Sequence, residues 1–354
     1  MKAAVVILNW NTKDLLRRFL PGLIDSCRGL DSEVIVADNA STDGSAEMMQ
    51  EEFPGTRVIR LDANYGFTGG YDRALEQVEA EYYVLINSDV EVTPGWLSPL
   101  LAWMDGHADC GACAPKLLSW YEHDRFEYAG AAGGLIDSLG YTFCRGRVMG
   151  MVENDRGQYD GPADVLWATG ACLMVRSALW HELGGLDDRF FAHMEEIDLC
   201  WRMQLQGWKV QVVPCSTVYH LGGATLPSTS PWKLQLNFRN NLLLLENNLA
   251  KTYALDCGSA AKALLKARMV ISFRMALDAC SAAVYLLTGR ADCFKAVLKA
   301  HKEYRRLRTQ VGKAALEEYI GSFRGKAHVA GRWTGWIVLT AILRKEKVFD
   351  RIKI

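Results

Sequence analysis

An acidic residue that follows a hydrophobic segment is the first candidate for chemistry in this sequence. Asn87-Ser88-Asp89 comes directly after the apolar run Tyr82–Ile86. Mg²⁺ and Mn²⁺ prefer oxygen ligands and are commonly held by one or two carboxylates together with the phosphate oxygens of a substrate. Asp89 therefore predicts one protein ligand for a divalent cation. Turns also use Asn, Ser and Asp often, so this segment needs support from others.

Two further segments could contact a nucleotide. Asp38 follows the apolar run Glu33–Ala37, and a carboxylate at this position could accept the N–H of a pyrimidine base. Residues 41–45 could instead serve as the cap of the next helix. Segment 64–70 contains three glycines, which would let the backbone approach a nucleotide closely.

These residues require a sheet that brings them together. From residue 3 to about 115, short apolar runs alternate with stretches of helical period, which predicts βαβ units and a largely parallel sheet with helices on both faces. Strands are expected at Ala4–Leu8, Glu33–Ala37, Arg57–Leu61, Tyr82–Ile86 and Cys110–Ala114, with helices beginning near Asp14, Ser45, Tyr71 and Pro94. Ligands of such sheets bind beyond the carboxyl ends of the strands, an edge that should gather Asn9, Asn11, Asp38, Asn39 and residues 62–70 and 87–89.

The first turn excludes two common nucleotide-binding sites. Asn9-Trp10-Asn11-Thr12 stands after the first strand, where a dinucleotide-binding domain has a glycine-rich turn. Neither that motif nor a P-loop is present in the sequence. A nucleotidyltransferase would also need a glycine-rich, basic loop at this point.

Taken together, four segments resemble those of family-2 glycosyltransferases, particularly bacterial rhamnosyltransferase-like members. They are Val6–Asn11, Asp38–Ser45, Asn64–Phe67 and Asn87–Val90, and the similarity in order and spacing extends over roughly residues 3–250. The resemblance implies a GT-A fold, an inverting reaction and a nucleotide-diphosphate sugar as donor. It also implies that Asp38 binds the base and Asp89 the cation. Asn87 occupies the first acidic position of the family's DxD pattern, which leaves Asp89 as the main cation ligand.

The resemblance assigns further residues to the donor and to the cation. His220 matches a position that can complete the cation site, and a neutral imidazole suits Mn²⁺ better than Mg²⁺. Arg239 could bind the diphosphate through bidentate contacts, or it could be a solvated helix residue. The donor-binding residues implied are Asn9, Asn11, Asp38, Asn64, Gly66, Asn87, Ser88 and Arg239.

A general base is expected in the segment 184–202. An inverting transfer needs a carboxylate that takes the proton of the acceptor hydroxyl. Family members usually carry Glu-Asp where this chain has Glu195-Glu196, and the second residue is the base, so Glu196 is the candidate. Glu195 is the alternative, because the longer side chain of a glutamate changes the reach. Acidic residues in a first helical turn also favour the helix dipole, which would explain this pair without catalysis.

The acceptor is expected on the same side as the base. Residues 167–171 match a segment that commonly lines the acceptor pocket in the family, although a buried strand would explain Trp167 equally well. The acceptor-binding residues implied are Trp167, Gly170, Trp201 and Arg202.

Composition favours a folded enzyme in a reducing compartment. Half of the 354 residues are hydrophobic, 23% are charged and the net charge is −1, so nothing in the overall charge indicates nucleic-acid binding. The ten cysteines have no repeating spacing and many lie in apolar segments, as is typical of cytosolic thiols. Cys110 and Cys113 form a CxxC motif inside an expected buried strand, and no second pair completes a zinc site.

The C-terminal region differs in charge from the rest. Residues 251–354 hold 21 Lys and Arg against 8 Asp and Glu, whereas residues 1–250 hold 19 against 33. We therefore expect a GT-A domain over residues 1–250 and a basic, mainly helical region over 251–354. Segments 269–278 and 333–343 lack the ~20 uninterrupted apolar residues that a helix needs to span a bilayer. They could instead lie on an anionic membrane surface, to which the basic segment 301–308 would add electrostatic attraction. A solvated appendage or an oligomer contact would also account for this composition.

The sequence thus predicts an inverting hexosyltransferase that uses Mn²⁺ or Mg²⁺. By resemblance, the donor is a dTDP- or UDP-linked sugar such as rhamnose, and the acceptor is a glycan or a polyprenyl-diphosphate-linked sugar of a cell-surface polysaccharide. The expected location is the cytoplasm, with peripheral attachment to the inner face of the cell membrane as an option. The alternative is a degenerate member that binds sugar nucleotides or acts as a membrane scaffold.

Overall fold

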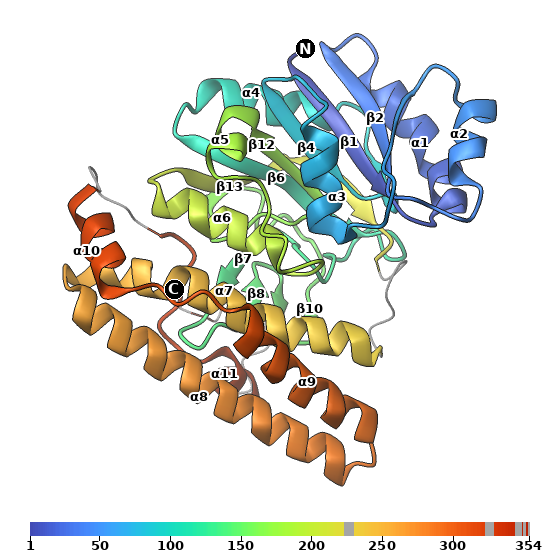
Figure 1. Ribbon diagram of the computed structural model, residues 1–354. Coiled ribbons are helices and arrows are strands. Elements are labelled where there is room, and N and C mark those ends of the chain that lie inside the picture. Colours follow the sequence, from blue (N-terminus) through green and yellow to red (C-terminus); the bar gives the residue numbers. More distant parts are fainter. Residues whose placement is uncertain (223–229, 323–328, 344–348, 350–351, 353–354) are drawn as a thin grey trace.

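A nine-stranded mixed sheet forms the centre of the N-terminal region (Figure 1). The computed structural model describes residues 1–222, 230–322, 329–343, 349 and 352. The strand order is β11-β13-β6-β12-β4-β1-β2-β3, and β5 pairs with β13. The strands are β1 (Ala3–Asn9), β2 (Ser32–Asp38), β3 (Arg57–Arg60), β4 (Tyr82–Ile86), β5 (Val90–Val92), β6 (Cys110–Ser119), β11 (Ala163–Asp164), β12 (Cys172–Arg176) and β13 (Lys209–His220).

The four strands that carry the predicted site are parallel. β1 pairs with β2 on one side and with β4 on the other, and β2 pairs with β3. Nearly every residue of β1 and β4 is buried, because helices cover both faces of a parallel sheet. The register Asn9 opposite Asp38 brings the last residues of β1 and β2 side by side. The predicted mostly parallel sheet is confirmed, with β12 and β11 as antiparallel additions.

Helices pack on both faces and enclose two hydrophobic cores. One core lies under α1 (Lys13–Cys27), α2 (Ser45–Glu52) and α4 (Leu97–Gly106). The other lies between the sheet and α3 (Gly66–Leu75), α5 (Ser177–Glu182), α6 (Glu195–Leu205) and the C-terminal helices. A separate four-stranded antiparallel sheet consists of β7 (Gly134–Ile136), β8 (Thr142–Cys144), β9 (Arg147–Val148) and β10 (Met151–Val152).

One element boundary differs from the sequence prediction. Helix α3 begins at Gly66, not near Tyr71, so the glycine segment forms the first turns of a helix. The chain is irregular over residues 165–171 before β12 begins at Cys172. β13 continues past Pro214 to His220, because a register shift between Val213 and Thr217 lets the strand resume its pairing with β6.

Five helices follow the sheet and make a layer beside it (Figure 1). They are α7 (Pro231–Cys257), α8 (Ala260–Leu287), α9 (Ala291–Leu307), α10 (Lys313–Ser322) and α11 (Ile337–Leu343). The predicted domain boundary near residue 250 falls inside α7, which contacts α6 of the sheet region as well as α8 and α9. In the described part of the chain, α8 is the one helix whose length and composition would allow it to cross a membrane.

All ten cysteines are free thiols in this structure. Cys110 and Cys113 lie in strand β6 and are buried, as the sequence predicted for this CxxC motif.

Candidate active site

Asn9 and Asp38 connect the carboxyl ends of β1 and β2. Asn9 Nδ2 donates to Asp38 Oδ1 at 2.8 Å and to Ser41 Oγ at 3.0 Å. The other oxygen of Asp38 accepts the backbone N–H of Ser41. Both side chains are buried, and each carboxylate oxygen has a further lone pair for another donor. The structure thus fixes the orientation of Asp38 at the sheet edge, and its contact with a base stays a prediction.

Asn11 shapes the loop that follows β2. Its φ of 54° places it in the left-handed region, which asparagine tolerates better than most residues. Its Oδ1 accepts the backbone N–H of Thr42 at 2.7 Å, and its own N–H donates to Ser41 Oγ. Trp10 beside it is 40% exposed and was not singled out from the sequence. Exposure of an indole at this edge could have marked it as a stacking surface for a base.

Asn39 connects the end of β2 with segment 64–66 through hydrogen bonds of its side chain. Asn39 Nδ2 donates to Asn64 Oδ1 at 3.1 Å and to the carbonyl of Gly66 at 2.9 Å, and Asn39 Oδ1 accepts from Tyr65 N. Gly66 has a φ of 71°, and a Cβ there would lie 2.6 Å from the carbonyl oxygen of Phe191. Gly66 is therefore required by close packing against Phe191, whichever contacts it makes with a donor.

Asp89 and His220 form the candidate cation site. Asp89 Oδ1 lies 3.1 Å from His220 Nε2, and both side chains are buried. β13 brings His220 opposite Val90 of β5, directly after Asp89. Ser88 is tied to the start of α1, since Thr12 Oγ1 donates to Ser88 Oγ at 2.9 Å. Asn87 is partly exposed, and its backbone N–H donates to the carbonyl of Ala171.

Glu127 is a third buried member of this group that sequence reasoning missed. Its Oε1 lies 3.5 Å from His220 Nδ1. This separation allows an ion pair but is long for a hydrogen bond. Burial would lower the pKa of His220, but Asp89 and Glu127 raise it to about 10. Burial would raise the pKa of Asp89, and the contact with His220 keeps it below the usual value. No motif marks Glu127, because the chain reaches it through a loop after β6.

The donor set fits a divalent cation. Two ligands at right angles around an ion at about 2.1 Å lie roughly 3 Å apart, which is close to the observed separation of Asp89 Oδ1 and His220 Nε2. Over the described residues, no group of three His, Cys, Asp or Glu is arranged to hold a metal. The protein would thus provide two ligands, and diphosphate oxygens and water would complete the coordination. Cation binding would displace the imidazolium proton, because both use the same nitrogen.

The residues before α6 adopt an unusual backbone conformation. Phe191, His193 and Met194 all have positive φ, between 64° and 72°. Such a conformation costs energy for residues with a Cβ and needs support from its surroundings. Asn240 on α7 supplies it, because its buried Nδ2 donates to the carbonyls of Phe190, Ala192 and His193 at 2.7 to 3.0 Å.

Arg239 belongs to the same support. Its Nη2 donates to the carbonyl of Phe190 at 2.6 Å, its Nε donates to Asn240 Oδ1, and Nη1 lies 3.4 Å from Glu303 on α9. The side chain is buried. The structure gives this guanidinium intramolecular partners, and the predicted contact with the diphosphate is not supported by this burial.

Glu195 and Glu196 occupy different environments at the first turn of α6. Glu195 is buried and its Oε2 has no hydrogen-bond partner. Glu196 is partly exposed and its side chain lies beside Gly170. Burial, together with the negative charge of Glu196, raises the pKa of Glu195 well above its usual value. Burial also raises the pKa of Glu196, against the backbone amides that stabilise its charged form.

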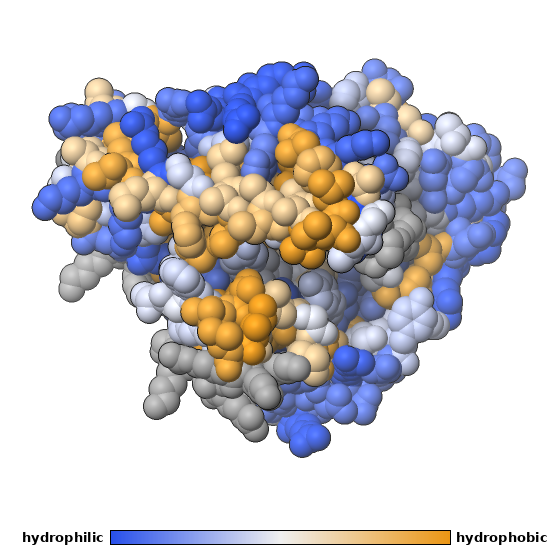
Figure 2. Space-filling view, turned by 90° about the horizontal axis from the view of Figure 1, so that it is seen from below, coloured by the Kyte–Doolittle hydropathy of each residue, from blue (hydrophilic) through white to orange (hydrophobic). Residues whose placement is uncertain are grey.

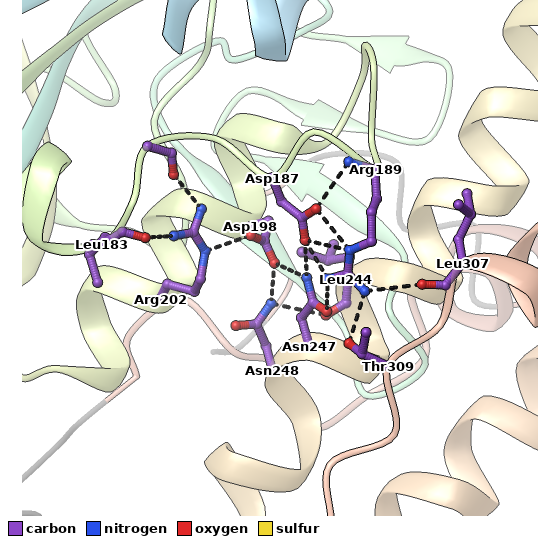
Figure 3. A network of polar contacts seen from close by, with 11 residues as sticks. Leu183, Asp187, Arg189, Asp198, Arg202, Leu244, Asn247, Asn248, Leu307 and Thr309 are labelled. Carbon is purple, nitrogen blue, oxygen red and sulfur yellow. Dashed lines mark hydrogen bonds and ion pairs between the residues drawn. The ribbon is translucent and has the colours of Figure 1, made fainter. Parts of the chain in front are cut away.

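A polar network behind this helix connects it to α7 and to the end of α9 (Figure 3). Asp198 accepts from Arg202 at 2.6 Å and from Asn247 and Asn248 on α7. Asn247 also contacts Asp187 and Arg189. Arg189 pairs with Asp187 and donates to the carbonyl of Leu307 and to Thr309 Oγ1.

The four predicted acceptor residues do not share one environment. Gly170 lies between Phe67 and Glu196, at the candidate base. Trp167 is buried under Gly134 and donates to the carbonyl of Leu135; it lies outside strand β12, so the buried-strand alternative is right about the burial and wrong about the strand. Trp201 is 1% exposed and donates to Thr252, so an acceptor contact is not supported for it. Arg202 donates to Asp198 and to two backbone carbonyls, which gives it a structural role in the network.

Direct contacts join these groups into one region. The backbone of Asn87, next to the cation site, bonds to Ala171, and the adjacent Gly170 contacts Glu196. On the other side, Phe191 O accepts the N–H of Phe67, beside the Gly66 carbonyl that Asn39 holds. The structure therefore brings the ends of β1, β2 and β4 and the start of α6 to one edge of the sheet.

Comparisons with known proteins agree with this arrangement. The family described as glycosyl transferase family 2 matches residues 4–127. The chain is 28% identical over 231 residues to N-acetylglucosaminyl-diphospho-decaprenol L-rhamnosyltransferase of Mycobacterium tuberculosis, a match that covers 61% of this chain and 75% of the relative. It is 25% identical over 239 residues to the O-antigen biosynthesis protein RfbC of Myxococcus xanthus, covering 65% of this chain and 18% of that protein.

A solved structure supports the fold. The crystal structure of GalNAc-T7 with UDP, GalNAc and Mn²⁺ aligns with a TM-score of 0.54 and 17% sequence identity. The alignment covers 70% of this chain and about half, 48%, of the solved chain. Taken with the family match and the bacterial relatives, this likeness confirms the predicted recognition and fold. Residues 4–127 match glycosyl transferase family 2, and the chain has a GT-A fold.

Proposed function

We propose that this glycosyltransferase transfers a hexose, with inversion, from a dTDP- or UDP-linked donor to a polyprenyl-diphosphate-linked acceptor. One observation carries the proposal. A buried Asp89–His220 pair and a carboxylate with a raised pKa, Glu196, lie at the same sheet edge and are linked through residues 87, 170 and 171. The rhamnosyltransferase relative, whose name includes a decaprenol-linked acceptor, supports rhamnose as the first sugar to test.

Donor binding would use the ends of β1 and β2. Asp38, oriented by Asn9 and Ser41, would accept the N–H of the pyrimidine base. Asp89 and His220 would hold a divalent cation, preferably Mn²⁺ because one ligand is an imidazole nitrogen. When bound, the cation supplies positive charge that offsets the charge developing on the diphosphate leaving group. Mn²⁺ in the GalNAc-T7 structure supports the choice of ion.

Glu196 would act as the base. Of the two glutamates, Glu195 is the more deeply buried and has an unpartnered oxygen, so it keeps its proton more readily. Glu196 is partly exposed and backbone amides stabilise its charged form, so it ionises first. A carboxylate with a raised pKa is also a stronger base for the hydroxyl proton of the acceptor.

A donor screen tests this function. Purified protein is incubated with dTDP-rhamnose or with other dTDP- and UDP-sugars, in the presence of a short-chain polyprenyl-diphosphate-linked acceptor and Mn²⁺ or Mg²⁺. The nucleoside diphosphate released from the donor is measured. We expect turnover with one donor and its loss in Asp89→Ala with unchanged circular dichroism. Activity of Asp89→Ala equal to that of the unchanged chain would remove the proposed mechanism. Binding of a sugar nucleotide without any turnover would favour the degenerate binding protein.

A further inference from the structure

The outer side of the helical layer carries exposed apolar residues along its length. On α8 the large exposed ones are Leu265, Met269, Phe273, Val284, Leu286 and Leu287, with 43% to 86% of each accessible. On α11 and the residue just before it they are Trp336, Leu339, Ile342 and Leu343, with 44% to 69% accessible. We call these ten residues the apolar face. Figure 2, which looks onto the side that is lowest in Figure 1, shows apolar atoms gathered there in a broad band.

The two helices contribute to one continuous surface. The rings of Phe273 on α8 and Trp336, which directly precedes α11, lie 5.8 Å apart. Soluble monomers seldom expose apolar patches of this extent without a partner for them. The apolar face therefore needs an occupant, and its charge pattern indicates which.

Basic residues flank the apolar face and acidic ones are lacking on it. Within α8 the single acid, Asp278, is buried, and α11 contains none. Lys262, Lys266 and Arg268 are exposed on the first turns of α8. Arg290 is exposed just beyond the other end. An apolar strip with positive charge at its ends and no exposed carboxylate complements an anionic bilayer, in which phosphates lie beside acyl chains.

The side of α8 opposite the apolar face is packed against the protein, so the helix lies along the surface of the helical layer. It packs small residues, Ala260, Ala263, Ala267 and Ala282, against the neighbouring helices. Arg274 and Asp278 form a buried pair at 2.9 Å within that packing, and Arg274 stacks on Tyr141. A spanning α8 would have to leave these contacts and take both charges into hydrocarbon, which is unfavourable for unpaired ionised side chains.

We propose that the apolar face of α8 and α11 docks on an anionic lipid bilayer, with the side chains inserted at the headgroup level and the flanking lysines and arginines on lipid phosphates. The proposal does not depend on the proposed reaction. It does agree with it, because strands β1, β2 and β4 run toward the helical layer in Figure 1, so that their carboxyl ends face the side on which α8 lies outermost. A lipid-linked acceptor would thus be presented on the side of the active site.

Vesicle flotation of the full chain tests the docking. We expect the protein to float with vesicles of phosphatidylcholine and phosphatidylglycerol, and much less with phosphatidylcholine alone. Met269→Glu combined with Leu287→Glu should reduce the partition coefficient roughly tenfold for each replaced side chain. Lys262→Ser combined with Arg268→Ser should reduce it roughly fivefold for each removed charge, on anionic vesicles only. Tyr121→Glu, a control at a residue that is 71% exposed outside the apolar face, should bind like the unchanged chain.

Three outcomes would overturn the proposal. The unchanged chain could stay in solution with anionic vesicles, or the Met269/Leu287 variant could float as well as the Tyr121 control. A dimer of the unchanged chain that becomes a monomer in the Met269/Leu287 variant, measured by analytical ultracentrifugation, would assign the apolar face to a second copy. Circular dichroism and thermal unfolding establish that the variants are folded, and release of the nucleoside diphosphate from the donor in the presence of a soluble acceptor separates loss of docking from loss of catalysis.

Discussion

Gly170 lies against the side chain of Glu196, one residue before Ala171, whose carbonyl accepts the backbone N–H of Asn87. A short peptide segment thus connects the candidate base on α6 with the cation site that follows β4. Because the two catalytic functions of an inverting transfer act on opposite sides of one sugar carbon, their relative position determines the rate. The segment 170–171 is therefore a structural part of the site.

Replacing each glutamate separately identifies the base. Glu196→Gln should reduce kcat by about 10² to 10⁴, the usual contribution of a positioned base. Glu195→Gln should keep most of the activity, because burial keeps the Glu195 carboxyl protonated and a neutral carboxyl cannot take up the proton of the acceptor. The measurement is steady-state diphosphate release with the preferred donor. If Glu195→Gln shows the larger loss, the roles of the two residues are reversed.

The pH dependence of the reaction should reflect the same pair. Burial raises the pKa values of Glu195 and Glu196, so kcat/KM should rise with pH through a value above the ordinary glutamate pKa of about 4.3. Because Glu195 still holds its proton when Glu196 ionises, Glu195→Gln should leave this acid limb nearly unchanged, whereas Glu196→Gln should remove it. A clear shift of the acid limb in Glu195→Gln would show that Glu195 is charged over the same pH range.

Glu127 should support cation binding through His220. A carboxylate that faces the second nitrogen of a metal-binding imidazole orients the ring and increases its affinity, and losing such a partner typically costs 10-fold to 100-fold in metal affinity. We expect Glu127→Gln to weaken Mn²⁺ binding within about this range, measured by electron paramagnetic resonance of free Mn²⁺. Glu122→Gln, at an exposed residue of the same loop, is the matched control. Equal Mn²⁺ affinities in the two variants would contradict a role for Glu127.

Asn240 should stabilise the loop before α6. Asn240→Ala leaves the carbonyls of Ala192 and His193 without this donor, while that of Phe190 keeps Arg239; each lost hydrogen bond contributes about 1 kcal/mol, so the free energy of unfolding should fall by roughly 2 kcal/mol. Urea denaturation followed by circular dichroism measures the change. Asn237→Ala, at a partly exposed position one turn earlier on α7, should change the stability by less than about 0.5 kcal/mol.

Asp72 should make stability depend on pH. Burial raises the pKa of Asp72 to about 7, above the usual value of 3.8. The folded state therefore holds the proton more tightly than the unfolded state, and stability falls as pH rises from about 4 to above 7. Asp72→Asn keeps an acceptor for the N–H of Leu186 and should raise the melting temperature at pH 8 more than at pH 5. Asp292→Asn, at an exposed residue, serves as the control.

Much of the fold could be predicted because local patterns and topology agree. Each of the five predicted strands overlaps an observed strand, since apolar runs between helical segments have few other solutions in a βαβ chain. Asp38 and Asp89 reached the sheet edge for the same reason. The start of α3 was placed five residues late, because glycine lowers helix propensity and close packing of Gly66 and Gly70 against Phe191 and Leu8 cannot be read from one segment.

The parts of the site that escaped prediction depend on distant contacts. Glu127 lies 93 residues from His220 in the chain and enters through an irregular loop. The sequence could not decide whether Arg239 binds the diphosphate or another part of the protein, because a guanidinium suits both. In the structure α7 passes Phe190, and Arg239 donates to the carbonyl of that residue. Trp201 was expected at the acceptor, but the rotation of α6 turns its indole toward Thr252.

The bond from Arg189 to the segment after α9 has a consequence for how the molecule works at a surface. Arg189 donates hydrogen bonds to Leu307 and Thr309 after α9. Through Asp187 and Asn247 it is also connected to α6, the helix that carries the candidate base. The helical layer cannot slide past the sheet without pulling on that linkage. A form of this enzyme shortened at residue 250 would lose the hydrogen bonds of Arg189 to Leu307 and Thr309. The C-terminal helices and the residues of the candidate active site should therefore be expressed and engineered together.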